Sequence, residues 1–400
     1  MKTKVEEFRP GISFDVYALD RHGSDLAYSP DVHVIAQDDP DAYRLAADRI
    51  NASGVDAVWL QHEYGIFGGP DGRLVTDLID RLAVPLVVTL HTILSTPSVG
   101  QRHVMERLLG RAGQVMVMSQ HGRDLLISLY GASHERVTVV AHGAPDRPFG
   151  REEHFKASLG VANRPVLMTF GLLGPGKGIE HAIEALPAIA ARHPDVLYRI
   201  VGATHPDLVR DQGERYRERL KARVAQLGLQ RNVAWDDRFL DTDELLDQLE
   251  ACDVYLTPYP NLQQSTSGTL SYAVALGKAV VSTRYIHACE LLADGVGVLV
   301  PAEEPSAISN AVNALLNTPE CLNALKMRAY AKGRSTIWQQ FADASANLVE
   351  KAVARKPTSA EPVDGAGHID GSRAATGQAF HLSRSDVARN TFQRLSPAHP

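Results

Sequence analysis

The sequence predicts an α/β protein of two Rossmann-like domains, each a parallel β-sheet with helices on both faces. The main observation is that short, continuously apolar segments alternate with amphipathic helical segments, which is typical of parallel strands covered on both sides. This alternation stops near Pro145, Pro148 and Gly150 and then begins again. A length of 400 residues also suits two or three domains, at about 150 residues each.

The first domain is expected over residues 1–148. Its candidate strands are the apolar segments FDVYAL, VHVIAQ, AVWLQH, PLVVTLH, QVMVMS and VTVVAHG. Between them lie helical segments whose apolar residues recur every three or four positions, as Tyr43, Ala47 and Ile50 do. The pattern therefore predicts a sheet whose successive strands are connected by helices.

The second domain is expected over residues 149–333, with the candidate strands PVLMTF, LYRIVG, NVAW, DVYLTPY, AVVST and VGVLV. A last helical pattern around Trp338 and Leu348 lies within residues 334–355. Residues 356–400 contain scattered Pro, Gly, Ser and Thr with little periodicity, and we expect a disordered tail there. Open parallel sheets bind ligands at the carboxyl ends of their strands, so function is expected in the loops that follow strands.

The composition excludes several classes of function. The chain has 41 basic and 47 acidic residues, a net charge of −6, so it has no basic surplus for binding nucleic acid. Three scattered cysteines provide neither a disulfide framework nor a zinc site. The start lacks the apolar core of a signal peptide, and no apolar stretch reaches the roughly 18 residues of a membrane span. We expect a soluble, cytoplasmic protein, and the sequence leaves its oligomeric state open.

A glycine-rich turn follows the candidate strand PVLMTF and leads into a helical segment. It contains Gly171, Gly174, Gly176 and Lys177. Glycines allow close backbone approach, a helix start offers free N–H groups, and the lysine adds a positive charge, so a phosphate fits this turn. The turn also matches G-x-x-x-x-G-K, but Gly178 stands where a nucleotide triphosphatase requires Ser or Thr to hold magnesium. A simple strand-to-helix turn with a solvated lysine is the alternative.

A second polar loop follows the candidate strand DVYLTPY and leads into another helical segment. It contains four hydroxyl residues and a glycine: Ser265, Thr266, Ser267, Gly268 and Thr269. Capping of a helix needs one or two of these hydroxyls, not four. A sugar or a phosphate as ligand explains the surplus better.

Three histidines end candidate strands of the first domain: His62, which Glu63 follows, His91 and His142. Each alone is more often a hydrogen-bonded structural residue, but three at the carboxyl ends of strands favour a binding surface. They are too far apart in sequence to indicate a metal site, and no His-Glu-x-x-His spacing is present. We therefore expect no metal.

Charged residues near the other strand ends have two interpretations each. Asp241 and Asp243 form an Asp-x-Asp pair that could hold a metal, but an apolar helical run follows directly, which favours helix capping. Arg238 and Phe239, after NVAW, either contact a nucleotide base or are a surface arginine and a core phenylalanine. Glu290 either borders the ligand crevice or caps the short helical segment ELLADG.

The order of these segments resembles the retaining glycosyltransferases of family four, which have the GT-B fold. The similarity depends on GLLGPGKG, ACDVYLTPY, TLSYAVALGKAVVST and ELLADGVGVLVPAEEP in the second half, and on HEYGIFGG, TLHT, VMSQHGRDLL and VVAHG in the first. It covers roughly residues 30–355. The resemblance implies two Rossmann-like parallel-sheet domains that face a central cleft, with the helix around Trp338 crossing back to the first domain.

The resemblance also implies roles for individual residues. Lys177 and His91 are the expected catalytic residues, the first as a ligand of the donor diphosphate and the second near the transferred sugar. The expected donor-binding residues are Gly171, Gly174, Gly176, Arg238, Phe239, Gln264, Ser267, Gly268 and Thr269. The residues expected on the acceptor side or elsewhere in the cleft are His62, Glu63, His142 and Glu290.

Three features depart from the family pattern. Leu172 replaces an arginine of the phosphate loop, while Gln264 and Tyr272 replace two glutamates, the second of which binds the ribose in the family. Gln264 can still hydrogen-bond a sugar hydroxyl, but Tyr272 lacks the paired acceptors of a carboxylate. The strand–turn–helix unit that normally opens the family does not fit the first residues, so this unit is absent or the recorded start is late.

We therefore expect a hexosyltransferase-type enzyme that moves a sugar from a nucleoside-diphosphate sugar to an acceptor hydroxyl, with retention of anomeric configuration and no metal or other cofactor. Its expected partners are the nucleotide-sugar donor and a saccharide or other hydroxyl acceptor, not nucleic acid. The alternatives are a GT-B-fold sugar-nucleotide epimerase and a non-catalytic, degenerate sugar-nucleotide-binding protein. The base, the sugar and the acceptor are not identified by these motifs.

Overall fold

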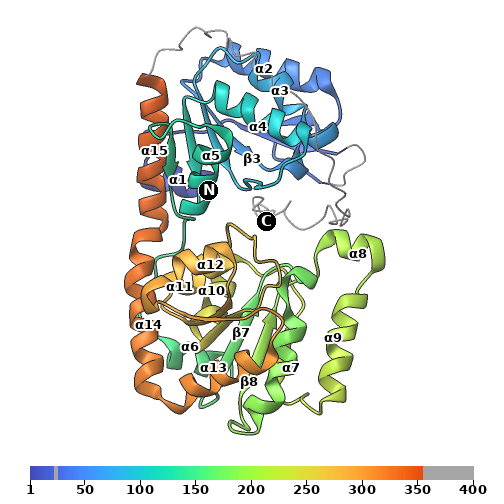
Figure 1. Cartoon of the computed structure of the whole chain (residues 1–400), viewed down its shortest axis with the longest axis vertical. Coiled ribbons are helices and arrows are strands. Elements are labelled where there is room, and N and C mark those ends of the chain that lie inside the picture. The colour runs from blue at the N-terminus through green and yellow to red at the C-terminus, as the bar shows by residue number, and fades with distance from the viewer. Residues whose placement is uncertain (22–25, 355–400) are drawn as a thin grey trace, which may run out of the picture.

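The computed structural model describes residues 1–21 and 26–354 of the chain, arranged in two domains one above the other (Figure 1). The expected tail, residues 356–400, lies outside the described residues. The strands of each domain pair in parallel, and helices pack on the faces of the sheets, so the α/β class expected from the alternating pattern is confirmed.

The first domain contains two sheets. β1 (Val16–Asp20) pairs with β2 (Val32–Ala36), and the other sheet has the strand order β3-β4-β5-β6. The strands of that sheet are β3 (Val58–His62), β4 (Leu86–Leu90), β5 (Gln114–Val117) and β6 (Val137–Val139). Every residue of β4 and β5 is buried, because alternate side chains enter apolar clusters on opposite faces of the sheet.

The helices of the first domain are α1 (Lys2–Phe8), α2 (Pro40–Ser53), α3 (Val75–Ile79), α4 (Val99–Arg111) and α5 (Gln120–Tyr130). The sequence explains the ends of α2. Asp39 caps its start by accepting a hydrogen bond from the Asp41 amide, and Gly54 ends it in the left-handed conformation. The face that carries Tyr43 is buried against the sheet, as its spacing predicts.

The second domain has one sheet with the strand order β12-β11-β10-β7-β8-β9. Its strands are β7 (Val166–Phe170), β8 (Leu197–Val201), β9 (Val233–Asp236), β10 (Val254–Thr257), β11 (Ala279–Thr283) and β12 (Val298–Val300). The chain adds β8 and β9 on one side of β7 and then returns to the other side with β10. Ligands of open α/β sheets bind at the carboxyl ends of the strands that flank such a reversal, here β7 and β10.

Helices cover both faces of this sheet. They are α6 (Glu152–Ser158), α7 (Ile179–Ala190), α8 (Pro206–Gln212), α9 (Arg215–Gln226), α10 (Thr242–Glu250), α11 (Gly268–Ala275), α12 (Ile286–Leu291), α13 (Pro305–Asn317) and α14 (Pro319–Gly333). One apolar cluster joins α7, α9 and α13 to the sheet, and another joins α10, α11 and α12 to the opposite face. This packing holds the strand ends, and therefore the loops after them, in fixed positions.

Two segments cross between the domains side by side. The first follows β6, and the second lies between α14 and α15 (Trp338–Ala354). The Ala144 amide donates a hydrogen bond to the Thr336 carbonyl oxygen (2.8 Å), and the Trp338 amide donates one to the Ala144 carbonyl oxygen (2.9 Å). Gly143 is required here, because a Cβ at this position would lie 2.2 Å from the Trp338 ring. The two crossings therefore form one packed unit.

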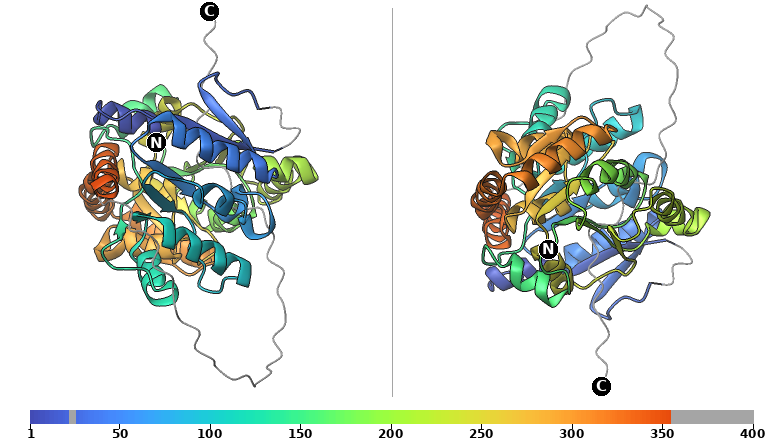
Figure 2. Two further views of the ribbon diagram at one scale, coloured as in Figure 1. Left: turned by 90° about the horizontal axis from the view of Figure 1, so that it is seen from above. Right: turned by 90° about the horizontal axis from the view of Figure 1, so that it is seen from below.

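α15 returns the chain to the first domain, where it packs against β4, β5 and α1. Its buried residues, which include Phe341 and Leu348, contact the sheet face that α2, α3 and α4 leave uncovered. Figures 1 and 2 show α14 and α15 along one edge of the molecule. Within residues 1–21 and 26–354, we find no helix with the length and apolar character that a membrane crossing requires.

Candidate active site

The glycine-rich turn after β7 places Lys177 beside the loop after β10. Residues Pro175–Lys177 form a 3-10 helix, and α7 begins at Ile179. The Lys177 ammonium donates a hydrogen bond to the hydroxyl of Tyr259 (Nζ–Oη 3.1 Å) and lies 4.6 Å from the centre of that ring. A positive charge therefore lies at the point where the strand order of the sheet reverses.

The glycines of this turn allow its tight path. Gly171 and Gly178 have φ values of 127° and 60°, which residues other than glycine rarely adopt. A Cβ on Gly178 would lie 2.0 Å from a carbonyl oxygen of the loop after β10, whereas a Cβ on Gly171 would lie 3.7 Å from the Lys177 Nζ. Gly174 precedes the 3-10 helix, and Gly176 lies within it. The turn therefore lies close to the loop after β10, and the Lys177 ammonium lies close to Gly171 of the same turn.

The start of α11 is the second part of the site. Ser267 caps this helix by accepting a hydrogen bond from the Leu270 amide (3.3 Å). The Thr269 hydroxyl lies 2.9 Å from the Tyr259 hydroxyl and 3.2 Å from the Ser267 hydroxyl. The first-turn amides of Gly268 and Thr269 have no carbonyl one turn earlier to bind, and the positive end of the helix dipole lies at the same place. Together with the ammonium group on the neighbouring turn, these amides suit a phosphate.

The first domain brings two histidines to this region. His142, which follows β6, lies with its Nε2 3.0 Å from where a Cβ on Gly268 would be. His91, which follows β4, has its Nε2 3.0 Å from Gln61 Oε1, and its carbonyl oxygen accepts a hydrogen bond from the Ser265 hydroxyl (3.3 Å). Burial lowers the pKa of His91 to about 4 and also lowers the pKa of His142, so both rings are neutral near neutral pH.

His62 and Glu63 lie deeper in the first domain than the sequence predicts. His62 is 0% exposed and stacks on Phe67 with 5.5 Å between ring centres, so its ring lies inside the domain and not on the surface where it was expected. Burial lowers its pKa to about 3, and its ring nitrogens have no hydrogen-bond partner among the described residues. The Glu63 carboxylate accepts hydrogen bonds from the Thr92 hydroxyl (2.7 Å) and the Tyr64 amide (3.2 Å), and burial raises its pKa to about 7.

Glu290, on α12, connects the two domains. Its carboxylate oxygens accept hydrogen bonds from the backbone amides of Gln120 and His121, each at 2.8 Å. These residues form the first turn of α5 in the other domain, and Ser119 caps the same helix by accepting from the Gly122 amide (3.1 Å). A carboxylate is stabilised at a helix N-terminus. Glu290 therefore caps a helix, but a helix of the first domain rather than the segment ELLADG.

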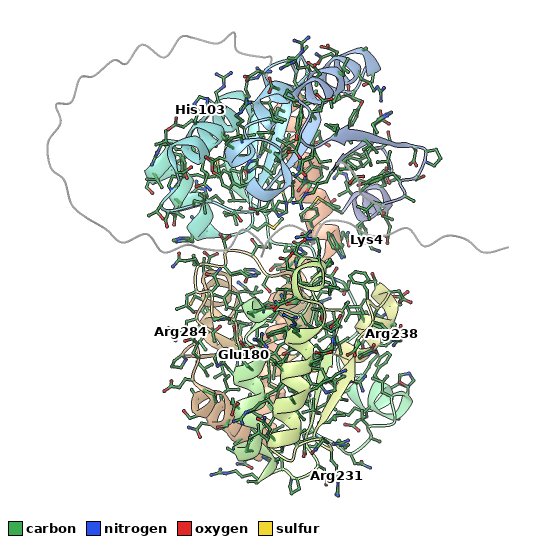
Figure 3. The ribbon with its side chains drawn as sticks, turned by 90° about the vertical axis from the view of Figure 1, so that its right-hand side faces the viewer. Lys4, His103, Glu180, Arg231, Arg238 and Arg284 are labelled. Atoms are coloured by element: carbon green, nitrogen blue, oxygen red, sulfur yellow. The ribbon has the colours of Figure 1, made fainter. Side chains whose placement is uncertain are left out.

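Arg238 and Phe239 follow β9 at the edge of the sheet, and Figure 3 shows Arg238 at the side of the second domain. Arg238 forms ion pairs with Asp236 (2.8 Å) and Glu244 (2.5 Å), which raise its pKa. Phe239 is 70% exposed, so it is not a core residue and its ring is free for contact with a ligand. Asp241 accepts a hydrogen bond from the Glu244 amide (2.8 Å) at the start of α10, which confirms the capping interpretation.

Two of the positions that depart from the family pattern, Gln264 and Tyr272, contact residues of the site. Gln264 donates a hydrogen bond from Nε2 to the Thr266 carbonyl oxygen (3.0 Å) within its own loop. Tyr272 packs edge-on against His142 and near Phe170, each with 6.4 Å between ring centres, and burial raises its pKa. This phenol is therefore uncharged near neutral pH.

The part of the chain that the structure describes contains no group of three or more His, Cys, Asp or Glu side chains suited to a metal ion.

Family models match both domains of this chain. One, described as Glycosyltransferase Family 4, matches residues 11–148, and another, described as Glycosyl transferases group 1, matches residues 150–333. The chain belongs to glycosyltransferase family 4. The resemblance in the motifs and their order is thus confirmed, and so is the assignment of the chain as a glycosyltransferase.

Similar proteins support the same fold for this family 4 glycosyltransferase. The D-inositol 3-phosphate glycosyltransferase of Corynebacterium glutamicum is 26% identical over 330 residues, which cover 77% of this chain and 75% of that protein. The crystal structure of Anabaena Alr3699/HepE in complex with UDP has a TM-score of 0.68 at 18% identity and covers 84% of this chain and 100% of its own. Sucrose-phosphate synthase from Thermosynechococcus elongatus has a TM-score of 0.67 at 17% identity, with 88% and 92% covered. These structures confirm the GT-B fold.

Seven of the fifteen expected residues of the glycosyltransferase lie where its two domains meet: Lys177, Ser267, Gly268, Thr269, His91, His142 and Glu290. Sequence reasoning missed Tyr259, which joins the two donor loops. The sequence feature that could have indicated Tyr259 as a site residue is its position two residues after β10. That signal is weak, because an aromatic residue at a strand end is usually part of the core.

Proposed function

We propose that this glycosyltransferase moves a sugar from a nucleoside-diphosphate sugar to an acceptor hydroxyl with retention of anomeric configuration. The observation that carries the proposal is the meeting of the Lys177 ammonium with the first turn of α11 at the carboxyl ends of β7 and β10. Such a combination binds the negative charge of a diphosphate. Similar structures solved with UDP and with UDP-glucose, such as those of Anabaena Alr3699/HepE, support a donor of this class.

The chemical task is to stabilise the charge that grows on the departing diphosphate as its bond to the sugar breaks. Lys177 and the first-turn amides of Gly268 and Thr269 belong to neighbouring loops that Tyr259 joins, so they are in place to stabilise this charge with little reorganisation. The protein itself supplies the positive charge, and the proposal therefore includes no metal or other cofactor. With retention, the acceptor oxygen approaches the face of the sugar that the diphosphate leaves, so the acceptor and the diphosphate are neighbours.

The two domains divide the substrates in this proposal. The second domain, residues 149–333, binds the donor, with the turn around Gly174 at the diphosphate and the exposed ring of Phe239 at the base. The first domain, residues 1–148, binds the acceptor and places the neutral ring of His91 near the transferred sugar. Contact between the domains excludes water, which would otherwise hydrolyse the donor.

Binding of nucleoside diphosphates tests the proposal directly. We would measure the affinity of UDP, GDP and ADP by calorimetry, and then the release of nucleoside diphosphate from the matching sugar donors. We expect one diphosphate to bind, Lys177→Met to weaken its binding, and Lys351→Met, a change of an exposed lysine on α15, to leave it unchanged. If none of the three diphosphates binds to the wild type, the proposed donor class is wrong.

A second candidate is a sugar-nucleotide-binding protein without turnover. Tyr272 favours it, because this residue stands where the family has a ribose-binding glutamate and because its phenol is packed between aromatic rings. Donor binding without release of nucleoside diphosphate, whatever acceptor is supplied, would support this candidate. Release that depends on an acceptor would instead support transfer over both binding alone and epimerisation.

A further inference from the structure

Tyr259 is a buried tyrosine that links the two loops of the proposed diphosphate site. It is 0% exposed and lies just after β10. Its hydroxyl accepts a hydrogen bond from Lys177 Nζ (3.1 Å) and lies 2.9 Å from the Thr269 Oγ1. Thr269 in turn contacts the hydroxyl of Ser267, which caps α11 (3.2 Å). One phenol thus connects the charge on the turn after β7 with the helix start that follows β10.

The rest of the Tyr259 side chain and its backbone are held in place. Its carbonyl oxygen accepts a hydrogen bond from the Thr283 hydroxyl (2.6 Å), and its ring stacks on Tyr285 with 5.1 Å between ring centres and 18° between planes. Burial alone would raise the pKa of this phenol, but the Lys177 ammonium and the neighbouring hydroxyls lower it below the usual value. The phenol oxygen is therefore in surroundings that favour negative charge, which suits a partner of an ammonium group.

We propose that Tyr259 is a positioning residue of the transfer reaction, whose hydroxyl holds the Lys177 ammonium against the first turn of α11 so that both bind the same diphosphate. This inference rests on the proposed nucleoside-diphosphate donor. A lysine side chain loses rotamer entropy when it binds a ligand, and a lysine that is held before the donor arrives loses less on binding. Because Tyr259 is fully buried, it acts through Lys177 and not by contact with the donor.

The experiment removes the hydroxyl and keeps the ring. Tyr259→Phe is compared with Tyr285→Phe, because Tyr285 is equally buried, stacks on the same ring, and directs its hydroxyl to Thr257 (3.4 Å) and not to a lysine. Calorimetry on the full chain measures the affinity of whichever of UDP, GDP and ADP binds the wild type best. The same titration is made with Lys177→Met and with the double variant Tyr259→Phe/Lys177→Met.

We expect Tyr259→Phe to weaken diphosphate binding by about tenfold, the effect of losing one hydrogen bond to a charged group, and Tyr285→Phe by less than about twofold. Once Lys177 is methionine, Tyr259→Phe should cause no further loss. An equal loss in both backgrounds, or equal effects of the two phenylalanine variants, overturns the positioning role and leaves the proposed donor intact. A wild type that binds none of the three diphosphates overturns both.

A spectroscopic measurement covers the case in which Tyr259→Phe does not fold. The near-ultraviolet absorbance of tyrosinate is followed with rising pH in the wild type and in Lys177→Met. If the ammonium is held on the phenol, one tyrosine of Lys177→Met ionises at a higher pH than in the wild type. Identical titration curves for the two proteins overturn the inference.

Discussion

Replacement of Glu290 by alanine should weaken the contact between the two domains. The lost interactions are the hydrogen bonds that the Gln120 and His121 amides donate to its carboxylate, each at 2.8 Å. A hydrogen bond to a charged group contributes about 1.5–3 kcal/mol, and less where water can replace the partner. Because Glu290 is only partly buried, we assign about 2 kcal/mol to both bonds together. This corresponds to roughly a 30-fold shift in the equilibrium between joined and separated domains.

Small-angle X-ray scattering, with and without a saturating nucleoside diphosphate, measures the shift. We expect Glu290→Ala to have a larger radius of gyration than the wild type without ligand and to approach the wild type at saturation. Its KM for the donor should rise by a larger factor than its kcat falls. Glu320→Ala, a change of an exposed residue on α14, is the control. If Glu290→Ala and the wild type have the same scattering and the same KM, the reasoning is refuted.

Other changes test the charge, the burial and the packing of the site. Lys177→Met should lower kcat by about 10²-fold or more in a transfer assay, because it removes a preorganised charge at the diphosphate. Burial raises the Glu63 pKa from 4.5 to about 7, so the folded state favours the protonated acid, and its stabilising contribution is lost as pH rises through this range. Between about pH 5 and about pH 8, the unfolding free energy of the wild type, measured with urea, should therefore fall by up to about 3 kcal/mol because of this group. In Glu63→Gln this part of the pH dependence should be absent. Gly143→Ala should lower the melting temperature, because its Cβ would collide with Trp338, whereas Gly110→Ala, in open space on α4, should not. Transfer should continue in EDTA, and a loss that manganese restores would contradict the metal-free proposal.

Much of the fold could be predicted because its signals are local. β4 and β7 are continuous apolar runs, and both are fully buried. Asp39 and Gly54 mark the ends of α2 through capping and left-handed backbone, which depend on adjacent residues alone. The general rule about strand ends predicted that the turn with Lys177 and the loop before α11 both border a ligand, and the family resemblance assigned both to the donor.

The features that could not be predicted depend on partners that are distant in sequence. Gln120 is 170 positions from Glu290, so the helix that this carboxylate caps is known only once the domains are placed. His62 resembles the other histidines at strand ends, but stacking on Phe67 removes it from the surface. Tyr259 has the appearance of a core residue until the hydrogen bond from Lys177 is seen.

The return of α15 to the first domain also determines the order in which the chain can mature during synthesis. Every strand and helix of the second domain leaves the ribosome before α15 does. Until then, one face of β4 and β5 is not covered by Phe341 and Leu348. The half that is made first is therefore completed last. Until then it carries an apolar sheet face that a nascent-chain chaperone could recognise.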